Sequence, residues 1–100
     1  MQNSPYQLFA TIPVKPQFFD LAKEAVLNII PQTLAEEGCE LFVLHEAPEE
    51  DNHTLYLYER FKDEEAYNHH HAQPYTKEVF KKYENWLSGP VIFTKLRQLS

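Results

Sequence analysis

Short stretches rich in β-branched, aliphatic and aromatic residues recur along the chain, separated by polar or turn-forming segments. Such stretches predict β-strands, and four can be placed, at residues 6–14, 39–46, 53–61 and 91–96. Pro13 in the first stretch indicates an edge position or a strand end, because proline cannot donate to a ladder. The acidic loop 47–52 is short enough to predict that the second and third strands form an antiparallel hairpin.

A different spacing follows the first strand, where apolar residues recur three and four positions apart. This pattern predicts an amphipathic helix whose core-facing side is formed by Phe18, Leu21, Ala22, Ala25, Val26, Ile29 and Ile30. Pro31 is expected to kink or restart the helix, because proline lacks a backbone donor and clashes with the preceding turn. Leu34 continues the apolar side, and Gly38 is the expected C-terminal stop.

The region between the third and fourth strands predicts two helices. Asp63 is placed to cap the first, which carries Ala66, Tyr67 and His70, and Pro74 suits the first turn of the second. The order β-α-β-β-α-α-β predicts an α+β, ferredoxin-like split βαβ fold with a four-stranded antiparallel sheet, in a single domain over residues 1–100. Helices on one face would leave the other, largely apolar face to pack on a second copy, so we expect a homodimer.

Composition narrows the classes of partner. The net charge of −6 and the pI of about 5.3 argue against nucleic acid, whose phosphates need a basic surface. The single Cys39 fits a reducing compartment, and no apolar stretch approaches the ~20 residues of a membrane span. With no signal-peptide pattern at the start, these features predict a small, acidic, soluble cytoplasmic domain. Gly38 and Gly89 are the only glycines, which excludes a glycine-rich phosphate loop and disfavours a nucleotide cofactor.

Three consecutive histidines, His69 to His71, suggest a metal site at first sight. Neighbouring helical residues point about 100° apart, so three adjacent imidazoles cannot converge on one ion, and we expect no bound metal. His70 shares a helix face with Tyr67, whereas His69 is expected toward the flank and His71 toward solvent. His70 is therefore either a core histidine bonded to a backbone carbonyl or a base in a pocket.

Glu59 is a charged residue inside a predicted strand, on the same strand face as Leu57 and Phe61. If that face looks toward the helices, Glu59 lies near the rim of a pocket. The alternative is an ion pair with a lysine or arginine across a dimer.

Three segments resemble the antibiotic biosynthesis monooxygenase (ABM) family of small dimeric ferredoxin-like proteins. They are IIPQTLAEEGCELF (29–42), LYERFKDEEAYNHHHAQPYTKEVF (57–80) and LSGPVIFTKL (87–96). The resemblance implies a dimeric α/β barrel, with two sheets packed face to face and one pocket per subunit between sheet and helices. Characterised members oxidise polycyclic or quinol substrates with molecular oxygen, using neither metal nor flavin. Others degrade haem, and one branch processes the phosphorylated autoinducer-2 signal.

Carried over residue by residue, the family histidine falls on His70, the strand glutamate on Glu59 and the pocket tyrosine on Tyr67. These three are the implied catalytic residues. Four further residues stand at pocket positions of the family and are expected to contact substrate, namely Leu57, Phe61, Tyr75 and Phe80. Two of them depart from the polyketide-oxidising members, which have an asparagine in place of Leu57 and a tryptophan in place of Phe61. The sequence departs from the haem-degrading members, which place a tryptophan where His70 stands and whose iron-ligating histidine falls near Phe80. Tyr75 stands where a second histidine is common.

These residues imply a cofactor-independent monooxygenase acting on a quinol or polyphenol, in which His70 takes a phenolic proton while Tyr67 and Glu59 hold the substrate and the imidazole. Two alternatives remain open. One is an isomerase or lyase on a small hydroxycarbonyl compound, and the other is a non-catalytic small-molecule-binding dimer in which His70 is structural. An anionic, phosphorylated substrate would need a cation in the pocket, and only Arg60, Lys77 or Lys81 look placed to reach one.

Overall fold

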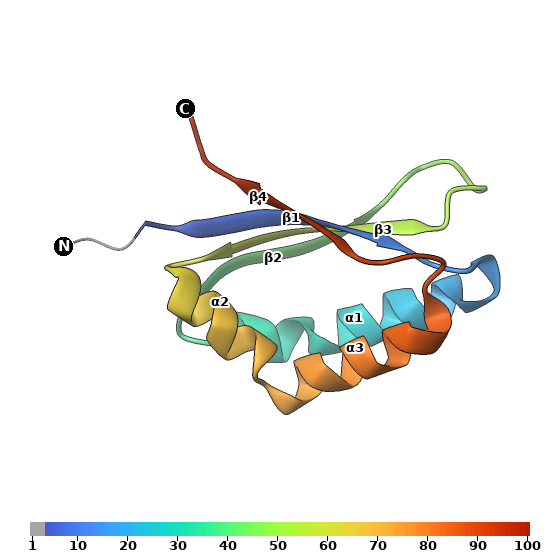
Figure 1. The fold of residues 1–100 in the computed structure, drawn as a ribbon, viewed down its shortest axis with the longest axis horizontal. Coiled ribbons are helices and arrows are strands. Elements are labelled where there is room, and N and C mark those ends of the chain that lie inside the picture. Colours follow the sequence, from blue (N-terminus) through green and yellow to red (C-terminus); the bar gives the residue numbers. More distant parts are fainter. Residues whose placement is uncertain (1–3) are drawn as a thin grey trace.

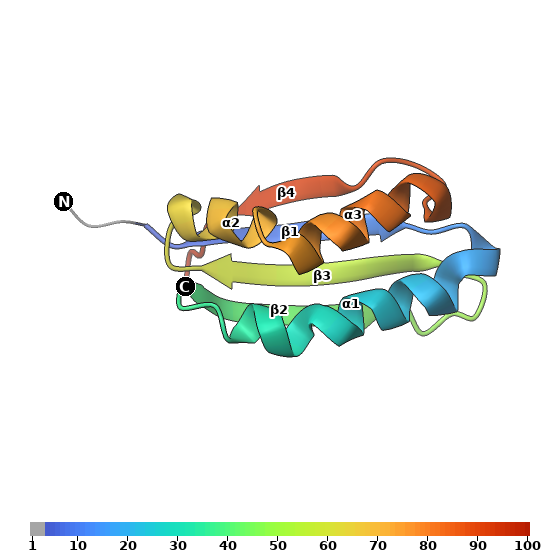
Figure 2. The same ribbon diagram turned by 90° about the horizontal axis from the view of Figure 1, so that it is seen from below.

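The computed structural model describes residues 4–100 and has the α+β, ferredoxin-like fold that the sequence predicts. Three helices cover one face of a four-stranded antiparallel sheet, and the other face carries no element (Figure 1, Figure 2). A 3₁₀ turn at Pro16–Phe18 leads into the first helix. The elements are β1 (Tyr6–Pro13), α1 (Phe19–Leu34), β2 (Cys39–Glu46), β3 (Thr54–Phe61), α2 (Glu64–His71), α3 (Pro74–Trp86) and β4 (Ile92–Leu96).

The strands lie in the order β2-β3-β1-β4, so the first and third strands form the middle of the sheet. β1 pairs with β3 over its whole length, and with β4 from Gln7 to Thr11. Pro13 therefore lies at the end of a central strand, beyond the last pair with β4, where its missing donor breaks no ladder bond on that side. β4 is an edge strand, and all of its residues are exposed.

The core lies between the sheet and the helices. Along β3, buried and half-buried residues alternate strictly, with Leu55, Leu57, Glu59 and Phe61 turned toward the helices. Full burial of an apolar side chain such as Phe61 or Leu55 contributes roughly 2 kcal/mol to stability. Glu59 lies in the same row, but burial of its carboxyl gives no comparable stabilisation. Its position therefore needs another explanation.

α1 does not restart at Pro31, which was one of the two effects predicted for this proline. The helix runs unbroken from Phe19 to Leu34, with Pro31 inside it. Pro31 and Leu27 are both exposed, so the carbonyl of Leu27, which loses its N–H partner to proline, faces solvent and can bond to water.

Gly38 serves a different purpose from the expected helix stop. α1 ends four residues earlier, and neither glycine has a positive φ. A Cβ at position 38 would clash with the Cβ of Ala66 in α2. Glycine is therefore needed for close approach, because the turn after α1 packs directly against the start of α2. Asp63 caps α2 as predicted, accepting a hydrogen bond from the Ala66 backbone N–H at 2.8 Å.

Within residues 4–100, no helix combines the length and the apolar character needed to cross a membrane.

Candidate functional site

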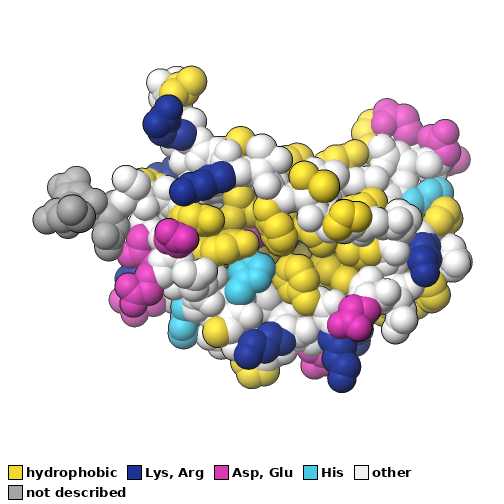
Figure 3. All heavy atoms as spheres, in the orientation of Figure 1, with side chains coloured by type: hydrophobic (Ala, Val, Ile, Leu, Met, Phe, Trp, Pro, Cys, Tyr) yellow, Lys and Arg dark blue, Asp and Glu magenta, His cyan; other side chains and the backbone are white. Residues whose placement is uncertain are grey.

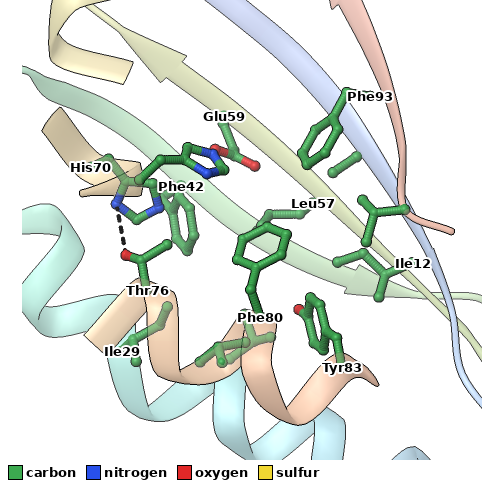
Figure 4. Close-up of a pocket in the computed structure, with 15 residues that line it drawn as sticks. Ile12, Ile29, Phe42, Leu57, Glu59, His70, Thr76, Phe80, Tyr83 and Phe93 are labelled. Atoms are coloured by element: carbon green, nitrogen blue, oxygen red, sulfur yellow. Dashed lines mark hydrogen bonds between the residues drawn. The ribbon is translucent and has the colours of Figure 1, made fainter. Parts of the chain in front are cut away.

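A small cavity lies between the helices and the inner face of the sheet (Figure 4). Its volume is about 30 Å³, room for one or two water molecules. Most of its walls are aliphatic or aromatic, contributed by every strand and by α1 and α3. The polar groups among the lining residues are Glu59, His70, His71, Thr76 and Tyr83.

A wider groove of about 490 Å³ adjoins the cavity, between the end of α3 and β4. The cavity and the groove share four lining residues, Phe80, Tyr83, Val91 and Phe93. Figure 3 shows hydrophobic side chains gathered in this hollow between sheet and helices, with a histidine beside them. The inner cavity and the outer groove are thus two compartments separated by aromatic side chains.

His70 is buried, with 3% of its surface exposed. Its Nδ1 lies 2.9 Å from Glu36 Oε2 and 3.5 Å from Thr76 Oγ1 (Figure 4 shows the Thr76 contact). Its ring packs on Phe42 and Phe61, with centroids 5.2 and 5.4 Å away. Within residues 4–100, both hydrogen-bond contacts of the His70 ring are made by Nδ1 and none by Nε2. One ring nitrogen is therefore held by the protein while His70 lines the cavity.

Glu59 lies on the cavity wall with 3% of its surface exposed. Burial, and secondarily the nearby charge of Glu36, raises the pKa of the Glu59 carboxyl to about 8. Its Oε1 is buried without a hydrogen-bond partner, and within one chain it forms no ion pair with any described residue. Glu59 is therefore a carboxylic acid that keeps its proton at neutral pH and has an unused polar atom at the site.

His71 does not point to solvent, contrary to the prediction. It lines the cavity, with ring centroids 4.4 Å from Tyr67 and 5.3 Å from Phe80. Burial, followed by the neighbouring His70, lowers the pKa of His71 to about 4, so the imidazole is neutral at neutral pH. The prediction assumed that one side of α2 stays open. In the structure the turn after α1 covers one side of this helix, and α3 and β4 cover the other.

The predicted site residues separate into two groups. His70, Glu59, Leu57 and Phe80 line the cavity. Three others lie outside its lining. Phe61 is fully buried in the core, and Tyr67 packs on Tyr6 and Phe61 at centroid distances of 4.7 and 5.7 Å. The Tyr75 hydroxyl donates to Glu36 instead.

Glu36 was not among the predicted site residues, although it contacts His70. It lies in the turn after α1, 34 positions from His70, and its side chain is only 6% exposed. One signal was available, because a carboxylate just beyond the C-terminal end of a helix is opposed by the helix dipole and calls for a compensating partner. Sequence alone does not say whether Glu36 or Glu37 takes this position.

The cavity has no lysine or arginine in its lining. Arg60 lies on the opposite sheet face, 2.7 Å from Glu40, and Lys77 and Lys81 are exposed on α3. Among residues 4–100, no three histidine, cysteine or acidic side chains are arranged to hold a metal ion. The charged and polar chemistry of the site therefore comes from carboxyl, imidazole and hydroxyl groups.

These features describe a small ferredoxin-like domain with an imidazole and a buried acid over an apolar cavity. The chain belongs to the antibiotic biosynthesis monooxygenase family, whose sequence model matches residues 5–82. Among curated proteins there is no match.

Solved structures share the fold over nearly the whole chain. Rv0793 from Mycobacterium tuberculosis is 27% identical, with a TM-score of 0.88 and 97% of each chain covered. PA3566 from Pseudomonas aeruginosa is 24% identical, with a TM-score of 0.89, covering 100% of this chain and 99% of the other. A Nitrosomonas europaea protein that bears the family's name is 20% identical, with a TM-score of 0.88, covering 99% of this chain and 94% of the other.

Proposed function

We propose that the protein is a homodimeric monooxygenase that oxidises a small, uncharged quinol or polyphenol with molecular oxygen, without a bound metal or flavin. The observation that carries the proposal is the cavity itself. There, an imidazole that is bonded through Nδ1 alone and a buried acid with an unpartnered oxygen lie among walls that are otherwise mainly apolar. The family of the chain supports the same class of reaction.

His70 is the proposed base. Its Nε2 accepts the proton of a phenolic hydroxyl, and the resulting phenolate is electron-rich enough to reduce oxygen. The overall reaction is a four-electron oxidation in which a quinol and oxygen give a hydroxyquinone and water. One oxygen atom enters the ring and the other leaves as water, so no external reductant is required. Dry, apolar walls protect the reactive intermediates from solvent.

Glu59 is the proposed hydrogen-bond donor to substrate. Because its pKa is raised to about 8, the carboxyl is protonated at neutral pH and can donate to a quinol or carbonyl oxygen. A substrate oxygen would give the unpartnered Oε1 of this buried acid a hydrogen-bond partner. The Tyr67 ring buttresses His71 and Phe61, so Tyr67 is proposed to support the wall of the site.

Charge selects against an anionic substrate. No lysine or arginine lines the cavity to balance a phosphate. Placing a dianion there would bury its charge in a poorly solvated space without a counterion. The substrate is therefore proposed to carry no phosphate.

A quinol ring can enter the inner cavity only if aromatic side chains of its wall move. A cavity of about 30 Å³ is too small for a quinol ring, whereas the adjoining groove of about 490 Å³ is ample. Phe93 lines both compartments, is 43% exposed and lies on the edge strand β4. We propose that the ring enters by displacing Phe93, so that its hydroxyl reaches His70 and the rest of the molecule occupies the groove.

A second candidate is isomerisation of a small, uncharged hydroxycarbonyl compound, with His70 moving a proton between carbons. The small inner cavity favours it, because a small hydroxyketone is smaller than a quinol and needs less displacement of the walls. The same absence of cations at the cavity argues against a phosphorylated form.

Oxygen uptake by the purified, metal-free protein on a panel of quinols tests the leading proposal. His70→Ala is expected to lose about a hundredfold or more of the turnover, because a positioned base contributes that much. His69→Ala is the matched control, since His69 lies on the same helix but is exposed and outside the cavity lining. Equal activity of the two folded variants would refute His70 as the base. Isomer formation from hydroxyketones without oxygen uptake would instead select the second candidate.

A further inference from the structure

Glu36 and His70 form a buried pair that joins two distant parts of the chain. Their side chains are 6% and 4% exposed, and Glu36 Oε2 lies 2.9 Å from His70 Nδ1. Burying a carboxylate and an imidazole together is a weak source of stability, because both groups lose their hydration. The position of Glu36 just beyond the C-terminal end of α1 is a further disadvantage, since the helix dipole opposes negative charge there. Stability alone therefore does not account for the pair.

Two protein groups hold one oxygen of the Glu36 carboxylate, Oε2, while Oε1 is buried without a hydrogen-bond partner. Tyr75 in α3 donates its hydroxyl to Oε2, the same oxygen that contacts His70. Thr76, the next residue, places its Oγ1 3.5 Å from His70 Nδ1 and is itself buried. The acid is thus clamped from α3 while it faces α2, so its contact with His70 has a defined geometry.

Glu59 makes no such contact. No hydrogen bond joins Glu59 to His70, and the Glu59 carboxyl has its pKa raised by burial and by the charge of Glu36. The two carboxyl groups therefore have different environments: Glu36 is hydrogen-bonded through Oε2, whereas Glu59 lines the mainly apolar cavity. Different environments suit carboxyl groups to different roles. Here Glu36 is suited to orient the imidazole and Glu59 to donate its proton in a hydrogen bond.

We propose that Glu36 is the positioning residue for His70. Accepting a hydrogen bond from Nδ1–H fixes the neutral imidazole in the tautomer whose lone pair is on Nε2, the nitrogen without a protein partner. When Nε2 takes a proton from substrate, the imidazolium that forms lies against the Glu36 carboxylate. In this role Glu36 orients the imidazole and exchanges no proton with substrate. This inference rests on the proposed role of His70 as base.

The tautomer of His70 tests the proposal without any substrate. Long-range ¹H–¹⁵N correlation spectra of the wild-type protein, recorded in alkaline buffer, should show the proton of His70 on Nδ1. In Glu36→Leu, which removes the acceptor, the fraction with the proton on Nε2 should rise at least severalfold. A wild-type His70 that carries its proton on Nε2 would overturn the proposal, whether or not any variant folds.

Kinetics supply the second readout. Glu36→Gln keeps the shape of the side chain but removes its charge, so kcat for quinol oxidation should fall roughly 10- to 100-fold while KM changes little. Glu37→Gln is the matched control. The carboxylate of Glu37, the next residue along the chain, is 94% exposed, so this variant should leave kcat unchanged. Glu36→Asp, which keeps the charge, should recover part of the loss. Wild-type kcat in a folded Glu36→Gln would overturn the proposal. If wild type oxidises no quinol, the proposed function fails, and the tautomer measurement alone decides this inference.

Discussion

Replacing Glu59 by glutamine is expected to stabilise the protein at neutral pH, although it removes a residue of the proposed site. The carboxyl is buried, and its pKa rises from an ordinary value of 4.5 to about 8 on folding. At about 1.4 kcal/mol per pH unit, this rise corresponds to about 5 kcal/mol once the carboxyl is ionised in both states. At pH 7, where the folded carboxyl still holds its proton, the cost is about 3 kcal/mol. Glutamine has nearly the same shape and nothing to ionise.

The direction of the pH dependence of stability follows from the number of protons that each state binds. Between pH 4.5 and pH 8 the folded state holds the Glu59 proton and the unfolded state does not, so stability falls as pH rises. His71 acts in the opposite sense, because its pKa is lowered from 6.5 to about 4, so stability rises with pH across that window. The two contributions oppose each other between pH 4.5 and 6.5, and only the Glu59 contribution remains from pH 6.5 to 8.

Chemical unfolding at a series of pH values is the assay, with wild type and Glu59→Gln at the same protein concentration. The difference between the two curves isolates Glu59. It should be near zero below pH 4.5 and grow to about 3 kcal/mol at pH 7. The charged or titratable groups that interact with Glu59 are Glu36, Cys39, Tyr67 and Tyr83, and all are unchanged in the variant. Glu24→Gln, an exposed carboxyl in α1, serves as control. A difference that does not vary with pH would refute the reasoning.

Two further predictions concern size and assembly. Phe93→Ala should merge the cavity with the groove and raise kcat/KM for bulky over small quinols. Because Phe93 is 43% exposed, the stability cost should stay near 1–2 kcal/mol; an unchanged ratio of the two kcat/KM values would contradict the proposed entry route. The outer sheet face exposes apolar residues, including Leu41, Val43 and Ile92, so the protein should sediment as a dimer at micromolar concentration. Val43→Asp should give a folded monomer, and a monomeric wild type would remove the basis for the interface.

The elements of the fold could be predicted because their signals are local. Alternation places Glu59, Leu57 and Phe61 on one strand face, and the structure has that face toward the helices. Asp63 and Pro74 start their helices through hydrogen bonding and ring geometry that depend only on adjacent residues.

The site could be predicted only in part, because its remaining features arise from packing between elements. His71 lines the cavity because α3 and β4 cover the side of α2 that a single helix would leave to solvent. Tyr75 shares a short segment with His70, yet its hydroxyl bonds to Glu36 and the residue does not line the cavity. Spacing along the chain contains no information on which of two adjacent glutamates reaches a histidine 34 residues away.

Gly38 connects the fold to the proposed chemistry. Any side chain at this position would meet Ala66 and push α2 away from the turn that follows α1. That turn carries Glu36, and α2 carries His70, so the close approach that glycine permits also brings the carboxylate within 2.9 Å of the imidazole. The backbone there needs no positive φ, so helix termination does not require glycine. The requirement for glycine therefore comes from the contact between two elements, and the same contact places His70 with one nitrogen occupied and the other free.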